Sequence, residues 1–160
     1  MRKTKSGFDN AWLAGFIDAD GSFAIRQTLE TRGKKLTECA FILVQRRYDS
    51  QTDSSYDFVF EGIARFLKCR VKSVLPHNGK EQVKLKLSSA LCKAKLRTYL
   101  TSWPLLSSKH LDFQAWCRVD DLINAQKHYL TSGVDEIRKI KKTINNQRTC
   151  FCWYHLELYF

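Results

Sequence analysis

The stretch AWLAGFIDADGSF, residues 11–23, decides the fold that we predict for this chain. Small residues recur at every fourth position, Ala11, Gly15 and Ala19, so they share one face of a helix. A face without bulk lets a second backbone approach closely. Leu13 and Ile17 lie on a neighbouring face that suits a core. The stretch therefore predicts a short helix that packs on two sides.

The two ends of this helix carry different signals. Asp9 or Asn10 is the expected N-cap, and Gly21 is the expected stop after the last turn. Asp18 and Asp20 fall in the last turn, where the helix dipole disfavours a carboxylate by up to about 1 kcal/mol. Free backbone carbonyls lie beside them. Such a set of oxygen atoms suits a hard divalent cation such as Mg²⁺, which keeps several waters.

Residues 13–21, LAGFIDADG, resemble the LAGLIDADG motif of homing endonucleases, and Phe16 in place of leucine is the one departure. The following sequence resembles the single-motif branch of that family more loosely, to about residue 148. The resemblance implies that the motif helices of two domains pack together and that the last acid of each binds divalent metal at the scissile phosphates. Asp20 is then the metal ligand, with the carbonyl of Ala19 nearby. The alternative is an amphipathic helix whose acids are solvated.

The resemblance assigns catalytic roles to two more residues. Gln45 resembles the polar residue that orients solvent in this family, and Lys109 resembles a lysine that polarises water or offsets phosphate charge. A plain edge-strand glutamine and a surface lysine are the respective alternatives. Asp18 is expected to fix the helix ends rather than to bind metal. The contact between two motif helices is expected at Ala11, Gly15, Asp18 and Ala19.

The composition fits a polyanionic partner. The chain has 160 residues with 27 Lys and Arg against 16 Asp and Glu, a formal net charge of +11. Each phosphate that such a protein neutralises releases counterions. Charge alone does not separate a nucleic-acid binder from other basic proteins. The length suits one domain burying about 70% of its unfolded surface; we expect it over residues 1–148, with an aromatic tail, 149–160, of unknown role.

The cysteines and the apolar runs indicate the redox state of the thiols and whether a membrane is involved. No C-x-x-C pair occurs among the six cysteines and no secretory signal precedes them, so we expect reduced thiols. Cys150, Cys152 and His155 suggest zinc only weakly, because the other half of a tetrahedral set lacks the usual spacing. No apolar run approaches the roughly 20 residues that span a bilayer, so no membrane partner is expected. The resemblance implies an intron-encoded protein of an organelle, a mitochondrion or a chloroplast.

Hydrophobic periodicity predicts the elements after the motif helix. In chain order they are strands over 22–30 and 36–47, a helix ending near Lys68, strands over 70–75 and 82–87, and helices over 88–100, from Ser107 or Ser108 to about Tyr129, and over 134–147. This order matches the α+β fold that the resemblance implies, the LAGLIDADG homing endonuclease fold αββαββα, with a saddle-shaped antiparallel sheet and helices on one side.

One face of the predicted sheet is basic. In the strand over 82–87, Val83, Leu85 and Leu87 alternate with polar and basic residues. A two-stranded ribbon fits the major groove of DNA; an ordinary solvated sheet face is the alternative. The residues expected to contact DNA are Arg26, Thr28, Arg32, Lys34, Arg46, Arg47, Arg70, Lys72, Lys80, Gln82, Lys84 and Lys86. The basic run over 138–148 is either a solvated face or a contact for backbone phosphates.

These expectations combine into a homodimeric, metal-dependent DNA endonuclease that promotes intron mobility. It would hydrolyse one phosphodiester in each strand of a long, near-palindromic double-stranded target, with water as the attacking group. Mg²⁺ is the expected metal; Mn²⁺ can substitute, and Ca²⁺ is expected to bind without supporting cleavage. Two alternatives stay open, an RNA-binding splicing cofactor (maturase) for the host intron RNA and a non-catalytic DNA-binding regulator on the same fold. Intact acids at 18 and 20 favour the endonuclease.

Overall fold

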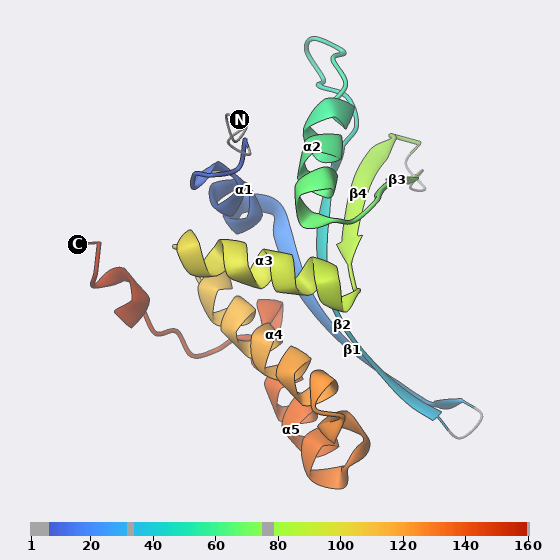
Figure 1. Cartoon of the computed structure of the whole chain (residues 1–160), viewed down its shortest axis with the longest axis vertical. Helices are drawn as coiled ribbons and strands as arrows, with labels where there is room; N and C mark the ends of the chain where they lie inside the picture. The colour runs from blue at the N-terminus through green and yellow to red at the C-terminus, as the bar shows by residue number, and fades with distance from the viewer. Residues whose placement is uncertain (1–6, 32–33, 75–78, 160) are drawn as a thin grey trace, which may run out of the picture. The chain divides into compact units, whose positions relative to one another are not determined.

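The computed structural model describes residues 7–31, 34–74 and 79–159 (Figure 1). Its elements are α1 (Trp12–Asp20), β1 (Gly21–Thr31), β2 (Lys34–Arg46), α2 (Asp57–Leu67), β3 (Val71–Val74), β4 (Gln82–Leu87), α3 (Ala90–Ser102), α4 (Lys109–Asn124), η1 (Lys127–Tyr129), α5 (Thr131–Lys141), η2 (Asn145–Gln147) and η3 (Tyr154–Leu156). The chain forms two compact units. Unit 1 comprises residues 1–22 and 41–104, and unit 2 comprises residues 23–40 and 105–160.

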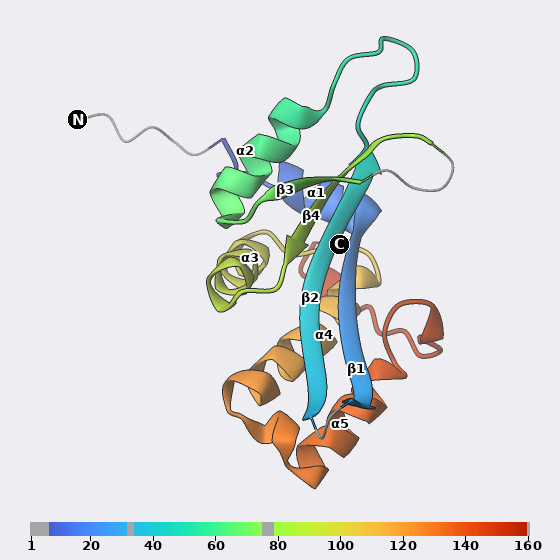
Figure 2. The ribbon, with the colours of Figure 1, turned by 90° about the vertical axis from the view of Figure 1, so that its right-hand side faces the viewer.

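The four strands form one sheet in the order β1-β2-β4-β3 (Figure 2). β4 pairs antiparallel with both β2 and β3, and Leu43 of β2 lies opposite Leu85 of β4. β4 therefore inserts between β2 and β3, although β3 precedes it in the chain. The predicted α+β class is confirmed. Among the described residues, no helix combines the length and the apolar character that a bilayer crossing requires.

The core of unit 1 lies under β4 and the second half of β2. Leu43, Leu85 and Leu87 are fully buried on one face of these strands. From α2, Ile63 and Leu67 are also fully buried, four residues apart as a helical stripe requires. Lys68, whose φ of +58° is left-handed, is the C-cap of α2. Ser89 is the N-cap of α3, and its hydroxyl accepts a hydrogen bond from the backbone N–H of Cys92.

The core of unit 2 is aromatic and includes a buried ion pair. Trp116 of α4 is fully buried, with its ring centre 5.6 Å from that of Phe23. On the same helix the buried carboxylate of Asp112 accepts hydrogen bonds from the guanidinium of Arg148, the shorter at 2.6 Å. Burying one charge without the other would be costly, so this pair ties the segment that follows α5 to α4.

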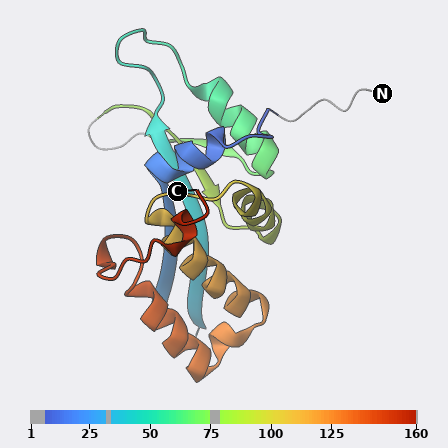
Figure 3. The ribbon, with the colours of Figure 1, turned by 90° about the vertical axis from the view of Figure 1, so that its left-hand side faces the viewer.

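The predicted boundaries of two helices in unit 2 are wrong. α4 ends at Asn124 rather than near Tyr129, because Gln126 has a φ of +57° and the chain turns into η1. α5 runs over Thr131–Lys141 instead of 134–147 and lies beside α4 (Figure 3). Gly133 was expected before the helix but lies inside it. A Cβ atom there would overlap the carbonyl of Lys127, so this glycine serves close packing rather than chain reversal.

The aromatic tail is partly anchored within unit 2. His155 stacks on His110 of α4 with ring centres 4.2 Å apart and planes within 5°. One ring nitrogen of His155 also lies 3.3 Å from the carbonyl oxygen of Leu106. Phe151 and Tyr154 remain exposed. The tail therefore has a fixed contact with the start of α4, while its role stays open.

Candidate active site and nucleic-acid interface

The N-terminal end of α1 is held by side chains from two places in unit 1. The helix begins at Trp12 and its N-cap is Ala11, so the predicted N-caps, Asn10 and Asp9, lie one and two residues too early. Asn10 nevertheless accepts a hydrogen bond from the backbone N–H of Trp12 at 2.9 Å. The buried hydroxyl of Tyr99, on α3, accepts from the N–H of Ala14 at 3.0 Å and donates to the carbonyl of Asn10 at 2.7 Å. Two helix N–H groups without an intrahelical partner are thereby satisfied.

The C-terminal end of α1 passes directly into β1 at Gly21. This glycine is not left-handed, as a helix-stopping glycine would be, but extended, with φ −71° and ψ 152°. An added Cβ atom would lie 2.6 Å from the carbonyl oxygen of Ile17 and 2.8 Å from the ring of Phe41. Gly21 is thus required because backbone and ring approach closely. The tight junction fixes Asp20, the last residue of the helix, against the end of β2.

Asp20 and Gln45, two of the three predicted catalytic residues, lie together in unit 1. The side-chain nitrogen of Gln45 donates to Asp20 Oδ2 at 3.4 Å. Its side-chain oxygen accepts from the backbone N–H of Arg46 at 3.0 Å, which fixes the amide so that the NH₂ group points to the carboxylate. Asp20 is exposed and Gln45 is half-buried. The pair is therefore ordered on one side and open to solvent or substrate on the other.

The donor atoms at this helix end fit a hard divalent cation. Mg²⁺ is commonly held by one or two carboxylates, and waters complete its coordination. Asp20 supplies one carboxylate, and the predicted second donor, the carbonyl of Ala19, belongs to the same turn of α1. Within residues 7–31, 34–74 and 79–159, no three His, Cys, Asp or Glu side chains gather as a metal site. In one copy of this unit, Asp20 is therefore the exposed carboxylate at the end of α1, and Asp18 in the same turn is half-buried.

Lys109, the third predicted catalytic residue, belongs to unit 2. It is the first residue of α4 and is half-buried. Its backbone N–H donates to the hydroxyl of Ser107 at 3.1 Å, one residue before Ser108, which is the N-cap of α4. The local structure thus fixes the backbone from which the lysine projects. Its catalytic role stays a prediction.

The small-residue face of α1 is open. Ala11, Gly15 and Ala19 are all exposed. A Cβ atom placed on Gly15 would have no atom within 4 Å. Leu13 and Ile17, on the other side of the helix, are fully buried. The helix therefore packs on its core side as predicted and presents a flat surface on the other.

The solvent face of the sheet in unit 1 is basic. Lys84 lies opposite Val44 on one side and Lys72 on the other, and Gln82 lies opposite Arg46. Cross-strand neighbours share a face, and in β4 the alternate residues Val83, Leu85 and Leu87 point to the core. The side chains that share this face are Ile42, Val44, Arg46, Lys72, Val74, Gln82, Lys84 and Lys86. We call this set the basic face.

Arg47 differs from the other predicted DNA contacts because acids already surround it. Its guanidinium donates to both carboxylate oxygens of Asp57, the shortest at 2.8 Å, and to Glu81 at 3.0 Å. The guanidinium lowers the pKa of the Asp57 carboxyl. Arg47 thus braces the end of β2 against the starts of α2 and β4. Sequence reasoning missed this brace, because its acids lie 10 and 34 residues away.

The remaining predicted contacts are scattered over both units. Arg70 and Lys80 are exposed in unit 1, and Arg26 and Thr28 are exposed in unit 2. Thr28 also donates its hydroxyl proton to the carbonyl of Leu36 at 3.1 Å. Arg32 and the side chain of Lys34 lie outside the described residues. Contact of any of these with DNA stays a prediction.

Comparison with known proteins decides the family. A family model described as LAGLIDADG endonuclease matches residues 13–119. This range includes nearly all of α1, the four strands and the first part of α4. This chain belongs to the LAGLIDADG endonuclease family. It is 29% identical, over 168 aligned residues, to the intron-encoded DNA endonuclease aI3 of Saccharomyces cerevisiae, covering 92% of this chain. This chain spans 40% of the length of that relative.

Solved structures confirm the predicted LAGLIDADG fold. The crystal structure of a homing endonuclease, I-TnaI, superposes with a TM-score of 0.69 at 20% identity, covering 84% of this chain and 86% of that chain. The I-SmaMI LAGLIDADG homing endonuclease bound to cleaved DNA superposes with a TM-score of 0.72 at 21% identity. That match covers 86% of this chain but 44% of I-SmaMI.

Proposed function

We propose that this LAGLIDADG protein is a site-specific DNA endonuclease that cuts both strands of its target with the help of a divalent metal. The observation that carries the proposal is the Asp20–Gln45 pair. A carboxylate at the end of the motif helix lies 3.4 Å from an amide whose orientation a backbone N–H fixes. In a protein of this family, such a pair combines a metal ligand with a group that positions water.

The catalytic centre, in this proposal, is shared between two copies of the chain. The open face at Ala11, Gly15 and Ala19 lets the helix α1 of one copy pack on that of another. In an isologous dimer the two Asp20 carboxylates lie symmetrically beside the two-fold axis. The match to less than half of I-SmaMI supports this reading, because a chain of that size has room for two such domains.

Each group of the chain then has a distinct task. Bound Mg²⁺ would supply charge to the scissile phosphate and lower the pKa of the attacking water. Asp20 would hold the metal, together with the carbonyl of Ala19. Gln45 would hydrogen-bond the water on the open side of the carboxylate, because its NH₂ group faces Asp20. Lys109 would offset the negative charge that develops on the phosphate.

Target recognition would come from the basic face. Lys and Arg side chains there suit phosphate oxygens and guanine edges, and Gln82 suits adenine. A symmetric dimer presents two copies of this surface, so the target should be long and near-palindromic. The name of the yeast relative, an intron-encoded DNA endonuclease, supports an intron-borne gene for this chain too, with action on organellar DNA.

The test is cleavage of a randomised double-stranded DNA library by the purified protein, followed by sequencing of the ends. We expect cuts at one near-palindromic site with Mg²⁺, and retention of that site without cuts with Ca²⁺. Selective retention with no cuts in either metal would contradict the endonuclease and favour a regulator. Absence of any DNA selection, with binding of the host intron RNA, would favour a splicing cofactor instead.

A further inference from the structure

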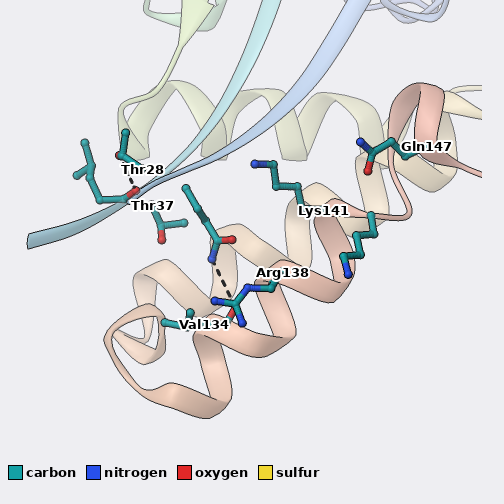
Figure 4. Close-up of a pocket in the computed structure, with 9 residues that line it drawn as sticks. Thr28, Thr37, Val134, Arg138, Lys141 and Gln147 are labelled. Carbon is teal, nitrogen blue, oxygen red and sulfur yellow. Dashed lines mark hydrogen bonds between the residues drawn. The ribbon is translucent and has the colours of Figure 1, made fainter. Parts of the chain in front are cut away.

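Two adjoining cavities lie in unit 2, between the edge strand β1 and the C-terminal end of α5. The first has a volume of about 310 Å³; Thr37 of β2 lines one side and Arg138 of α5 the other (Figure 4). The second, also about 310 Å³, is lined by Arg26 of β1 and by Asn146 of η2. Lys141 and Gln147 line both cavities. We call the pair of cavities the β1 groove.

The β1 groove has a strong excess of positive charge. Its linings contain four cationic side chains, Arg26, Arg138, Lys141 and Lys142, and no acidic one. Asp135 pairs with Arg138 at 2.8 Å, but both side chains are more than half exposed, so this bond holds the arginine weakly. Lys141 and Lys142 have no ion-pair partner in the part of the chain that the structure describes. The complementary ligand is therefore an anion.

The walls of the cavities are apolar where the cations do not reach. Leu36 and Val134 line the first cavity, and Ile25 and Ile144 line the second. Each volume lies at the lower end of the range of roughly 300–1,000 Å³ that is typical of ligand sites. Gln147 and Asn146 also line the cavities, and their amide groups carry both donors and acceptors, as base edges require. Because a duplex keeps its bases stacked inside, only an unpaired strand can place a base in such a cavity.

The groove is built on a fixed scaffold. The side-chain nitrogen of Asn145 donates to the carbonyl of Phe23 at 2.9 Å, and its backbone N–H donates to the buried Asp112 at 3.2 Å. Gln27 of β1 donates to the carbonyl of Val134 at 3.4 Å (Figure 4). These bonds hold η2 and α5 against the edge of β1, so the lysines project from a pre-organised wall.

We propose that the β1 groove binds an unpaired polynucleotide strand, with its phosphates at Arg138, Lys141 and Lys142 and a base in each cavity. A positively charged groove that tracks the backbone and surfaces that accept base planes are the two parts of such a site. The inference goes beyond the proposed cleavage of duplex DNA and does not depend on it. The strand is either RNA or single-stranded DNA, and the experiment separates the two.

The test measures binding of the full chain to labelled RNA and DNA strands of roughly 12 nucleotides, and to a duplex of the same sequence. The groove variant replaces Lys141 and Lys142 by alanine. The control variant replaces Lys127 and Lys139, two exposed lysines that line neither cavity, so both variants lose the same charge. The groove variant should bind unpaired strands about tenfold more weakly, with a salt slope smaller by about 1.4, and the control should change little.

Four outcomes decide the inference. Tighter binding of RNA than of DNA, weakened in the groove variant but not in the control, would support it and assign the 2′-hydroxyl a contact. Equal binding of both strands, weakened in the same way, would support a site for either strand. Equal weakening by the control variant would overturn it, because net charge alone would explain the affinity. Equal weakening of duplex binding in the groove variant would also overturn it and assign the groove to the duplex.

A charge-neutral variant tests the cavities themselves. Gln147→Ala removes an amide that lines both cavities, whereas Asn124→Ala removes an exposed amide from the end of α4. We expect Gln147→Ala to bind the unpaired strand about threefold more weakly than the wild type. Asn124→Ala should bind it with unchanged affinity. Identical affinities of the two variants, with intact folds by circular dichroism, would contradict a base in the cavities.

Discussion

At the scale of the residue, Asp20 combines exposure with a fixed neighbour. Its hydrogen bond to Gln45 is 3.4 Å long and lies at the surface, so replacing the carboxylate by an amide should leave the fold intact. Asp20→Asn removes a metal-ligand charge and little volume. We expect it to abolish cleavage and to leave binding of the target near that of the wild type. Gel-shift and cleavage assays on one duplex measure both.

The matched control for that change is Asp9→Asn, the same substitution at an exposed residue before α1. It should cut as the wild type does. Normal cleavage by Asp20→Asn would show that the proposed centre is wrong.

The cysteines provide a second prediction at this scale. Burial raises the pKa of the Cys69 thiol to about 11, and the neighbouring Cys92 adds to this shift. Because the thiolate is the reactive form, Cys69 should resist alkylation at neutral pH and react faster only as the pH rises toward its pKa. Cys150 and Cys152 are exposed and should react first. Mass spectrometry after timed alkylation would measure the order, and early modification of Cys69 would contradict it.

The residues of the candidate site were predictable to different degrees. Asp20 and Gln45 could be predicted from the motif and its resemblance, and the structure brings the two together. The role of Tyr99 could not, because its partner Asn10 is 89 residues away and no local pattern marks the contact. Gly21 was predicted as a helix stop, but the ring that requires it belongs to Phe41, a neighbour only in the fold.

At the scale of the element, α1 depends on a hydroxyl from α3. Tyr99→Phe would leave the backbone N–H of Ala14 and the carbonyl of Asn10 without this partner. Leaving the buried N–H of Ala14 unsatisfied costs about 1–3 kcal/mol of unfolding free energy. Denaturant unfolding should show that loss. Tyr129→Phe, at an exposed tyrosine, should stay within about 0.5 kcal/mol, and equal values for the two variants would contradict the anchoring role.

Elements were predicted best where one face is buried and the period is clear. The strand over 82–87 matches β4 in both bounds, because apolar and basic residues alternate strictly along it. The last helices were predicted less well. Gly133 indicated a break by its residue type, yet α5 includes it, since close contact with Lys127 requires a residue without a side chain. Periodicity along one segment carries no information on such contacts between segments.

At the scale of the whole molecule, the proposed dimer makes one sharp prediction. Gly15→Gln places a long side chain on the open face of α1, where the single chain has no atom within 4 Å of the new Cβ. The folded chain should therefore tolerate it, and a helix interior gains roughly 0.5–1 kcal/mol when glycine is replaced by a better helix former. Dimer formation, on DNA or in solution, should be blocked.

Sedimentation velocity with and without the target duplex measures this outcome. Ala94→Gln, at an exposed position of α3, is the matched control and should dimerise as the wild type does. Unchanged dimerisation of Gly15→Gln would count against the small-residue face as the contact. A wild-type monomer on bound duplex would contradict the shared centre altogether.

The spacing of side chains on the basic face would determine which base pairs of a DNA target the sheet contacts. Residues on one face of a strand are about 6.6–6.8 Å apart, twice the rise per residue, and base pairs in B-form DNA are about 3.4 Å apart. A strand that lies along the groove therefore meets every second base pair with Gln82, Lys84 and Lys86. The rows of β2 and β3 run in register with them, as Arg46 beside Gln82 and Lys72 beside Lys84 do. The sheet would thus read its target in steps of two base pairs, so exchanges of Gln82 and Lys84 should relax positions that are two base pairs apart.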